Sequence, residues 1–151
     1  MLEYIDIRLA TVEDCKAVEG CVTNAYTGYI ERIGKPPAPM LADYAALIAQ
    51  GVVYILMTQA QLVGVLVMKP LPTCLLVENV AVQPACQGRG FGRKLMDFAE
   101  QFARNIGLDE VHLYTNERMT ENLDFYASLG FQELSRREED GYRRVFLGKK
   151  L

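Results

Sequence analysis

The sequence predicts one domain of mixed α/β class, in which strand-like and helix-like segments alternate along 151 residues. Half of the residues are hydrophobic, so a chain of this length can bury a core of its own. Apolar runs with a period of two, typical of strands, occur beside longer stretches with the 3.6-residue period of helices. No linker rich in Gly, Ser or Pro and no internal repeat divides the chain. Residues 1–151 are therefore expected to form a single domain.

The N-terminal third predicts a strand, a helix, a proline-rich loop and a second helix. Apolar and polar side chains alternate over residues 5–9, as in a half-buried strand. Thr11 and Asp14 have the spacing of a capping box, so a helix is expected to begin there. Three prolines within residues 35–40 exclude a regular helix and favour a stiff extended loop. The second helix is expected over residues 41–50, because a glycine follows it as a C-terminal cap.

The rest of the chain predicts two hairpins, a central strand and two more helices. The strand at residues 74–82 is nearly all apolar, which is typical of a strand covered on both faces. The helix at residues 92–106 is expected to bury one side formed by Leu95, Phe98, Ala99, Phe102 and Ile106. The other expected elements are a hairpin (52–58 and 62–69), a strand (111–115), a short helix (121–129) and a closing hairpin (131–136 and 142–147) with a charged turn.

A glycine-rich loop, Gln87-Gly88-Arg89-Gly90-Phe91-Gly92, joins the central strand to the helix that follows it. A helix N-terminus presents unpaired N–H groups and a partial positive charge, and glycine lets a ligand come close to the backbone. Arg89, Arg93 and Lys94 add cationic side chains, so the loop predicts a phosphate-bearing ligand. The chain contains no Gly-Lys-Ser/Thr, which excludes an NTPase phosphate loop. The third glycine of the dinucleotide fingerprint is also missing.

Two motifs in the chain have a defined spacing. The first is Gln-x-x-Gly-x-Gly, formed by Gln87, Gly90 and Gly92. The second is Asn-x-x-x-Tyr-x-x-x-Gly-Phe, which begins at Asn122 and places its tyrosine at Tyr126. Both resemble motifs of the GNAT superfamily of acyl-CoA-dependent N-acyltransferases, and the resemblance covers about residues 5–147. It implies the GNAT fold, a strongly twisted, mixed and mostly antiparallel sheet with helices on both faces.

The resemblance also implies where the cosubstrate acetyl-CoA binds. In the family this loop holds the pyrophosphate of coenzyme A, which here assigns residues Gln87, Gly88, Arg89, Gly90, Phe91, Gly92 and Arg93. The main chain of Val80, Ala81 and Val82 is expected to hold the pantetheine arm, with one amide facing the thioester carbonyl. Asn122 is expected to bind the cofactor or to cap its helix, and Phe125 to pack against the cofactor or the core.

Tyr126 matches the general acid of the family, which protonates the departing thiolate. A phenol with an ordinary pKa near 10 is protonated at neutral pH and suits this role. A packed tyrosine of a short helix is the alternative. Glu78 is the ionisable side chain of the apolar strand, and a period of two places it on the same face as Val80 and Val82. It is a candidate general base, with a structural ion pair to an arginine or a solvent position at the end of the sheet as the alternatives.

The segment after the first helix forms the acceptor pocket in the family. Tyr26, Tyr29 and Glu31 are therefore the candidate substrate-binding residues, since two aromatic rings and an acid suit a cationic amine. A packed lid without substrate contact is the alternative. Glu31 is also a second candidate base. His112 is expected on the surface, because its neighbours Val111 and Leu113 occupy the opposite face of their strand.

The composition of the chain limits the classes of partner, compartment and metal site that we expect. A net charge of −3 argues against nucleic acid as the main partner. No apolar run approaches the about 20 residues that cross a bilayer, and the N-terminus lacks the features of a signal peptide, so a cytoplasmic protein is expected. Four cysteines without a Cys-x-x-Cys pair and one histidine predict no metal site. Homodimers are common in the family, so a homodimer that meets through the closing hairpin is a further expectation.

The sequence therefore predicts an N-acetyltransferase that moves an acetyl group from acetyl-CoA to a primary amine of a small molecule or peptide. A non-catalytic module that binds or senses acyl-CoA is the alternative within the same fold. A nucleotide-phosphate binder of another fold is disfavoured by the two missing loop motifs.

Overall fold

The computed structural model describes residues 4–151; residues 1–3 of the predicted domain lie outside the described part. Seven strands form one sheet in the order β1-β2-β3-β4-β5-β7-β6. Each neighbouring pair is antiparallel except β4 and β5, which are parallel. The strands are β1 (Ile5–Leu9), β2 (Val53–Thr58), β3 (Gln61–Pro70), β4 (Leu75–Val82), β5 (Glu110–Asn116), β6 (Gln132–Glu139) and β7 (Tyr142–Lys150).

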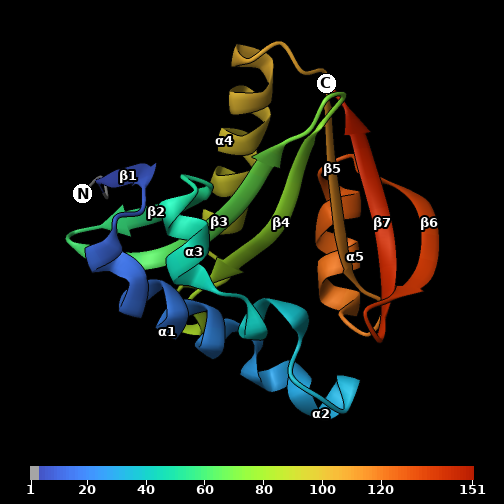
Figure 1. The fold of residues 1–151 in the computed structure, drawn as a ribbon, viewed down its shortest axis with the longest axis horizontal. Helices are drawn as coiled ribbons and strands as arrows, with labels where there is room; N and C mark the ends of the chain where they lie inside the picture. The colour runs from blue at the N-terminus through green and yellow to red at the C-terminus, as the bar shows by residue number, and fades with distance from the viewer. Residues whose placement is uncertain (1–3) are drawn as a thin grey trace.

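Helices cover both faces of the sheet and enclose two cores. On one face, α1 and α3 pack against β2 and β3 around Val18, Val22 and Ile55. On the other face, α4 and α5 enclose a core that includes Leu95 and Leu113 (Figure 1). This arrangement confirms the predicted mixed α/β class. The helices are α1 (Cys15–Tyr26), α2 (Ile30–Ile33), α3 (Tyr44–Ala49), α4 (Phe91–Asn105) and α5 (Thr120–Ser128), with 3-10 turns η1 (Val12–Asp14), η2 (Thr27–Tyr29), η3 (Ala38–Leu41) and η4 (Pro84–Cys86).

The parallel strands β4 and β5 are paired over only part of their length. Their register joins Leu75–Val77 to Val111–Leu113 and then stops. Figure 1 shows the two strands meeting near the C-terminus of the chain and diverging toward the opposite end. The second half of β4 therefore has β3 on one side and no strand on the other. The sheet opens at its centre, beside the start of α4 and next to α5.

A β-bulge in β4 changes which face its side chains occupy. In the register with β3, Met68 is opposite Val77 and Val67 is opposite Asn79, so Glu78 has no partner. As a result Val77 and Val80, three residues apart, both pack into the core beside α4. The predicted alternation that placed Glu78 on the face of Val80 and Val82 is wrong for this reason. Glu78 instead lies beside Tyr44 of α3 and Tyr114 of β5.

Several predicted boundaries shift for local reasons. The proline-rich loop contains the 3-10 turn η3, since Pro39 near its start needs no N–H donor there. The following helix begins at Tyr44 rather than residue 41, because the Asp43 carboxylate caps it through the Ala46 N–H at 3.1 Å. The closing hairpin extends through the charged segment, and its turn lies at Asp140 and Gly141, both with positive φ.

The buried side of α4 differs from the predicted one. Phe98 and Phe102 are half-buried against Tyr54, and Ile106 is exposed. The buried positions of α4 are Phe91, Leu95, Met96, Ala99, Glu100 and Ala103, so two of the predicted residues, Leu95 and Ala99, are among them. Glu100 accepts hydrogen bonds from Lys149 at 2.9 and 3.1 Å, which allows a carboxylate to lie within this helix face. The observed buried face of α4 therefore differs from the predicted one, because the prediction used apolar residues alone and did not include the paired Glu100.

Within residues 4–151, no helix combines the length and the apolar character that a bilayer crossing requires.

Candidate functional site

A cavity at the open centre of the sheet encloses about 520 Å³, part of it open to solvent. We call it the central pocket. It lies between the two halves of the sheet, with α1 and the proline-rich segment on one side and the β6–β7 hairpin on the other. Its lining comprises residues 77–80, residues 114–116, residues 37–39, Tyr26, Met119, Asn122, Tyr126, Tyr142 and Arg144.

A second, longer hollow of about 1140 Å³ runs along the glycine-rich loop. We call it the loop groove. It is bounded by the end of β4, the start of α4 and one side of α5. Its lining comprises Tyr29, Val80, Val82, Cys86, Gln87, Gly88, Gly90, Phe91, Gly92, Arg93, Glu121, Asn122, Phe125 and Tyr126.

The two cavities share three lining residues, Val80, Asn122 and Tyr126. A ligand in the loop groove can therefore meet a ligand in the central pocket at these residues. Val80 comes from the open part of β4, and the other two come from α5. Both sequence motifs line the loop groove, although about 30 residues of helix and strand separate them in the chain.

Tyr126 is buried at this junction, with 6% of its surface exposed. Its ring packs edge-on against Phe131 at 5.8 Å and tilted against Phe125 at 5.2 Å. Burial raises the pKa of its hydroxyl above the ordinary value, because a phenolate is poorly solvated there. The side chain is therefore held in one place and protonated at neutral pH.

The backbone of the glycine-rich loop takes conformations that favour glycine. Gly88 and Gly90 have φ of 79° and 83°, and Gly90 is the N-cap of α4. The 15-residue helix α4 therefore begins directly at the loop groove, with its first N–H groups at that end. Gly92 packs against Phe125 so closely that an added Cβ would lie 3.3 Å from the ring. These features bring α4, α5 and the loop into contact around the groove.

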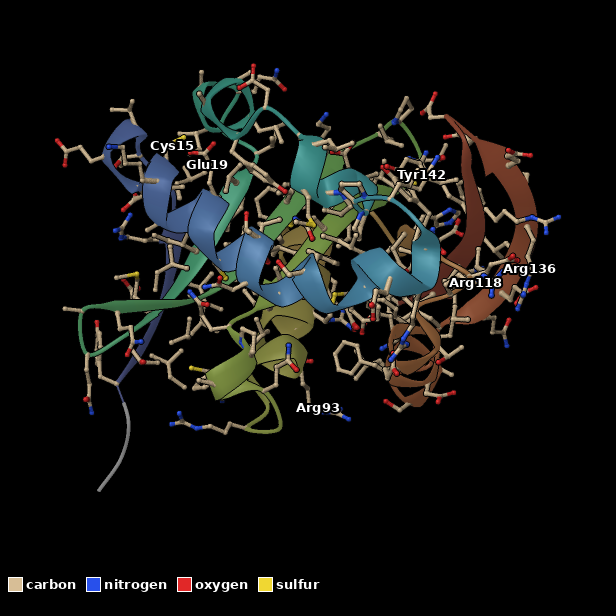
Figure 2. All side chains as sticks on the ribbon, turned by 90° about the horizontal axis from the view of Figure 1, so that it is seen from below. Cys15, Glu19, Arg93, Arg118, Arg136 and Tyr142 are labelled. Carbon is tan, nitrogen blue, oxygen red and sulfur yellow. The ribbon has the colours of Figure 1, made fainter. Side chains whose placement is uncertain are left out.

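The polar side chains of the loop occupy different positions. Gln87 donates from Nε2 to the Val82 carbonyl at 3.2 Å and so ties the loop to β4. Arg89 places its guanidinium over the Phe91 ring, 5.1 Å from the centroid. Arg93 is exposed, lines the groove and extends from the start of α4 in Figure 2. Figure 2 also shows Tyr142, which lines the central pocket, far from Arg93 at the β6–β7 hairpin.

The open edge of β4 presents the backbone of Val80 and Val82. The Gln83 N–H bonds the Val63 carbonyl at 2.9 Å, which fixes the alternation of the ladder with β3. By this alternation Ala81 directs its N–H and C=O toward β3, and Val80 and Val82 direct theirs away. The Ala81 side chain packs in the core beside α1. The structure thus places Val80 and Val82 at the open edge but not Ala81.

A buried polar network that the sequence did not reveal supports this edge. Asn79 donates to the Tyr44 hydroxyl at 3.0 Å, and that hydroxyl donates to the Pro39 carbonyl at 2.6 Å. The Tyr26 hydroxyl lies 2.6 Å from Asn79 Oδ1 and 3.0 Å from the Val80 carbonyl. Burial raises the pKa of Tyr26, so its single proton stays available to these acceptors. An asparagine within an apolar strand was the signal that could have indicated this network.

Glu78 lines the central pocket and forms an ion pair. Its carboxylate lies 3.3 Å from Lys69 Nζ, and 24% of the side chain is exposed. The ion-pair alternative considered for this residue is therefore present, with lysine as the partner. Among the described residues that line the central pocket, Glu78 is the one carboxylate.

The predicted acceptor residues separate into different places. Tyr26 lines the central pocket, whereas Tyr29 lines the loop groove. Glu31 is exposed and is not among the described residues that line either cavity. The acid beside Tyr29 is Glu121, which accepts from its hydroxyl at 3.2 Å and from Arg32 at 2.8 Å. The Arg32 hydrogen bond lowers the pKa of Glu121 to about 2.

Asn122 does not cap α5, and it is partly buried. Its Nδ2 lies 3.5 Å from Thr115 Oγ1 and from Met119 Sδ, so it links α5 to the end of β5. Asn122 lines both cavities, and its predicted cofactor role stays a prediction. His112 is half-buried beside Glu110, at 3.2 Å, and lines neither cavity.

Arg144 is a lining residue that the sequence did not single out. It is 8% exposed and lies on β7 opposite Asn116 of β5. Its guanidinium lies over the Tyr114 ring at 4.5 Å from the centroid. The signal in the sequence was its place between Tyr142 and Phe146 in the period-two pattern of the last strand.

Comparisons with known proteins bear on this fold and site. Over 61 residues, 40% of this chain, it is 49% identical to N-alpha-acetyltransferase 80 of Mus musculus, and the match covers 18% of that protein. Over 73 residues it is 32% identical to the uncharacterized N-acetyltransferase YvbK of Bacillus subtilis, covering 48% of this chain and 47% of that one. The matched part thus spans less than half the length of either relative.

Solved structures share the fold at low identity. The PaiA N-acetyltransferase of Thermoplasma acidophilum in complex with coenzyme A has a TM-score of 0.77 at 18% identity, covering 98% of this chain and 99% of that one. The ribosomal-protein-S18-alanine N-acetyltransferase of Escherichia coli has a TM-score of 0.77 at 18% identity, covering 97% and 94%. The model of the acetyltransferase (GNAT) family matches residues 22–131, from within α1 to the end of the second sequence motif. The chain belongs to the GNAT acetyltransferase family.

Proposed function

We propose that this protein transfers an acetyl group from acetyl-CoA to a primary amine, directly and within a ternary complex. The observation that carries the proposal is the junction at Val80, Asn122 and Tyr126, where the loop groove meets the central pocket. Acetyl-CoA bound along the groove would bring its thioester to this junction. An amine in the central pocket would approach it from the other side, so no covalent enzyme intermediate is needed.

The chemistry follows from the residues at the junction. The amine nitrogen attacks the thioester carbonyl, a C–N bond forms and the C–S bond breaks. The coenzyme A sulfur takes its proton from the Tyr126 hydroxyl, and the amine gives up a proton during transfer. The free N–H of Val80 or Val82 faces the opening and can donate to the carbonyl oxygen as negative charge develops there. The unpaired N–H groups at the start of α4, which has Gly90 as its N-cap, and the Arg93 side chain favour binding of the pyrophosphate.

Glu78 is the proposed base, because it is the carboxylate that lines the central pocket. It would take the amine proton directly or through a water molecule. Glu78→Gln is expected to flatten the acidic limb of the pH–rate profile, and an unaltered profile would dismiss Glu78 as the base.

The proposal is tested by acetyl-CoA-dependent thiol release with a panel of amines, polyamines, amino acids, aminoglycosides and N-terminal peptides. A thermal-shift series with CoA, ATP and NAD is run beside it. We expect stabilisation by CoA and thiol release with at least one amine. Stabilisation by ATP or NAD but not by CoA would contradict the assignment of the groove. CoA binding without release from any amine would favour the sensing module instead.

A further inference from the structure

Arg144 is a buried cation in the wall of the central pocket, and the proposed transfer chemistry gives it no role. Only 8% of its surface is exposed. A charged side chain loses hydration when it is buried and is retained where partners or a ligand compensate for that loss. The hydrogen-bond partners of the Arg144 guanidinium therefore indicate which of its N–H groups remain available to a ligand.

The protein partners of Arg144 occupy one corner of the guanidinium. Nη1 donates to Glu139 Oε1 at 2.7 Å and lies 3.7 Å from Asp140 Oδ2. A guanidinium has five N–H groups, and among the described residues no partner bonds those on Nε and Nη2 of Arg144. Yet no fully covered side-chain nitrogen or oxygen in the described part of the chain lacks a hydrogen-bond partner. Nε and Nη2 are therefore not fully covered, and the cavity that Arg144 lines is the central pocket.

Aromatic rings hold the guanidinium in position. The Tyr114 ring centroid is 4.5 Å from its central carbon, and the Tyr142 ring centroid is 6.0 Å away. Tyr142 is itself fixed, because its hydroxyl donates to the Pro36 carbonyl at 2.6 Å. A planar guanidinium held in this way is a preorganised fork that matches a carboxylate with two parallel hydrogen bonds.

The charge around this wall of the pocket is positive in excess. Arg137 shares the Glu139 carboxylate at 3.2 Å, and Lys35 Nζ lies 4.1 Å from the Tyr142 ring centroid. With Arg144, three cations thus lie on this side of the pocket against two carboxylates, Glu139 and Asp140, and Asp140 is 81% exposed and well solvated. Glu78, on the β4 side of the pocket, is paired with Lys69. An anionic group of a ligand can therefore bind beside Arg144 without displacing Glu139 or Asp140.

We propose that the acceptor is a primary amine that also carries a carboxylate, with Arg144 binding that carboxylate while the amine lies at the junction by Val80 and Tyr126. The inference rests on the proposed transferase function and names the substrate class of the same site. Two sources supply this chemistry: the α-carboxylate of a free amino acid, or the acidic side chain of the first residue of a peptide. Arg144 is then a specificity-determining residue.

The test compares acceptors that differ only in charge. Thiol release is measured for the free amino acids against their α-carboxamides, and for Asp-Ala-Ala-amide against Asn-Ala-Ala-amide. We expect kcat/KM to favour the carboxylate member of a pair by about 10- to 100-fold, mainly through KM, as a charge-assisted hydrogen-bond pair allows. The first set of pairs reports a free amino acid, and the second reports a peptide. Equal kcat/KM within every pair would overturn the inference and leave the transferase proposal standing.

Two variants with opposite expected effects test whether Arg144 causes the preference for carboxylate acceptors. Arg144→Gln should bring the ratio within each pair close to one, with CoA affinity unchanged because Arg144 does not line the loop groove. Glu139→Gln keeps the guanidinium but removes its carboxylate partner, so it should increase the preference for the carboxylate acceptor. A Glu139→Gln enzyme with a decreased preference would contradict the assignment, whether or not Arg144→Gln folds.

A binding measurement separates failure of the inference from failure of the proposed function. Calorimetry with CoA present compares the N-acetylated members of both sets of pairs, N-acetyl amino acids against their amides and N-acetyl-Asp-Ala-Ala-amide against N-acetyl-Asn-Ala-Ala-amide, and needs no turnover. Tighter binding of the carboxylate member in the wild type, lost in Arg144→Gln, supports the inference even if no amine is acetylated. Absence of any preference in this experiment overturns it.

Discussion

At the scale of single residues, the site depends on hydroxyl groups whose burial keeps them protonated. Burial raises the pKa of both Tyr126 and Tyr26, because neither phenolate could be solvated in its surroundings. The two differ in their partners. Tyr26 is bound to Asn79 and faces the Val80 carbonyl, whereas Tyr126 lines both cavities. Tyr126 is therefore the hydroxyl placed to give its proton to a ligand.

Replacing Tyr126 by phenylalanine tests this role. Tyr126→Phe keeps the ring contacts with Phe125 and Phe131 and removes only the proton donor. We expect kcat to fall by about 100-fold or more, as for the loss of a general acid, with CoA affinity nearly unchanged. Tyr54→Phe, whose ring packs on Phe98 outside both cavities, is the matched control and should retain full turnover. Unchanged turnover in Tyr126→Phe would remove it as the acid.

At the scale of elements, the structure shows how short segments set the geometry of larger ones. The loop between β1 and α1 is closed by Asp14, which accepts from the Thr11 N–H at 2.7 Å and from Arg8 at 2.9 Å. The glycine-rich loop sets the start of α4 in the same way through Gly90. A change in either loop is expected to act on the element that follows it.

The Asp14 contact predicts an acid-dependent loss of stability. The Arg8 hydrogen bond lowers the pKa of Asp14 from its ordinary 3.8 to about 2. A depressed carboxylate pKa stabilises the folded state above the unfolded value, and this contribution is lost as pH falls through about 2. Because Arg8 is partly exposed, we expect Asp14→Asn to lower the free energy of unfolding by about 1 kcal/mol at pH 7.

Urea unfolding of wild type and Asp14→Asn at several pH values measures this contribution. The difference between them should shrink steadily below pH 4 and reach its minimum only below about pH 2, where the carboxyl is protonated in both states. A difference that stays constant from pH 7 to pH 2 would show that the charge of Asp14 is not its cause.

The positive φ of Gly90 predicts a separate effect on ligand binding. Gly90→Ala forces a Cβ into the left-handed region, which costs about 1–2 kcal/mol and disfavours the observed loop. We expect the affinity for CoA, measured by calorimetry, to fall by about 5- to 30-fold. Gly20→Ala within α1, where an added Cβ meets open space, is the control and should bind CoA normally. Equal affinities for both variants would mean that the loop conformation does not govern binding.

The sequence predicted the elements and the two motifs well but not how the elements meet. Periodicity identified the strands, and the capping box at Thr11 and Asp14 identified the 3-10 turn η1, because these are local properties; α1 itself begins at Cys15, after that turn. The bulge at Glu78 and the network of Asn79 with Tyr26 and Tyr44 depend on residues up to 53 positions apart. Arg144 likewise became a pocket residue through its strand neighbours. Such positions depend on tertiary contacts, which a local pattern does not encode.

At the scale of the whole molecule, the sheet is two half-sheets joined where Leu75–Val77 meet Val111–Leu113. The loop groove and the central pocket lie where the halves separate. Most of the central pocket is built from segments distant in the chain, including the proline-rich segment and the β6–β7 hairpin. Lys35 Nζ donates to the Gly141 carbonyl at 2.6 Å and connects these two segments.

Hydrogen exchange should report the opening of the sheet directly. We expect the amides of Val80 and Val82 to exchange faster in the free protein than those of Asn79 and Ala81, which point toward β3. Addition of CoA should slow the exchange of Val80 and Val82 selectively, as measured by NMR. Equal protection of all four amides before CoA is added would contradict the open edge.

The occupied carbonyls along this edge have a consequence for solubility. An unpaired strand normally offers alternating donors and acceptors, which is a template for a strand from another molecule. Here the Val82 carbonyl already receives the Gln87 amide, and the Val80 carbonyl faces the Tyr26 hydroxyl. The groups that remain are the backbone N–H donors of Val80 and Val82. They can bind a ligand with carbonyl oxygens, but they cannot form the alternating donor and acceptor pattern that pairs two β-strands. The gap in the sheet is thereby expected to be a poor template for a strand of a second molecule.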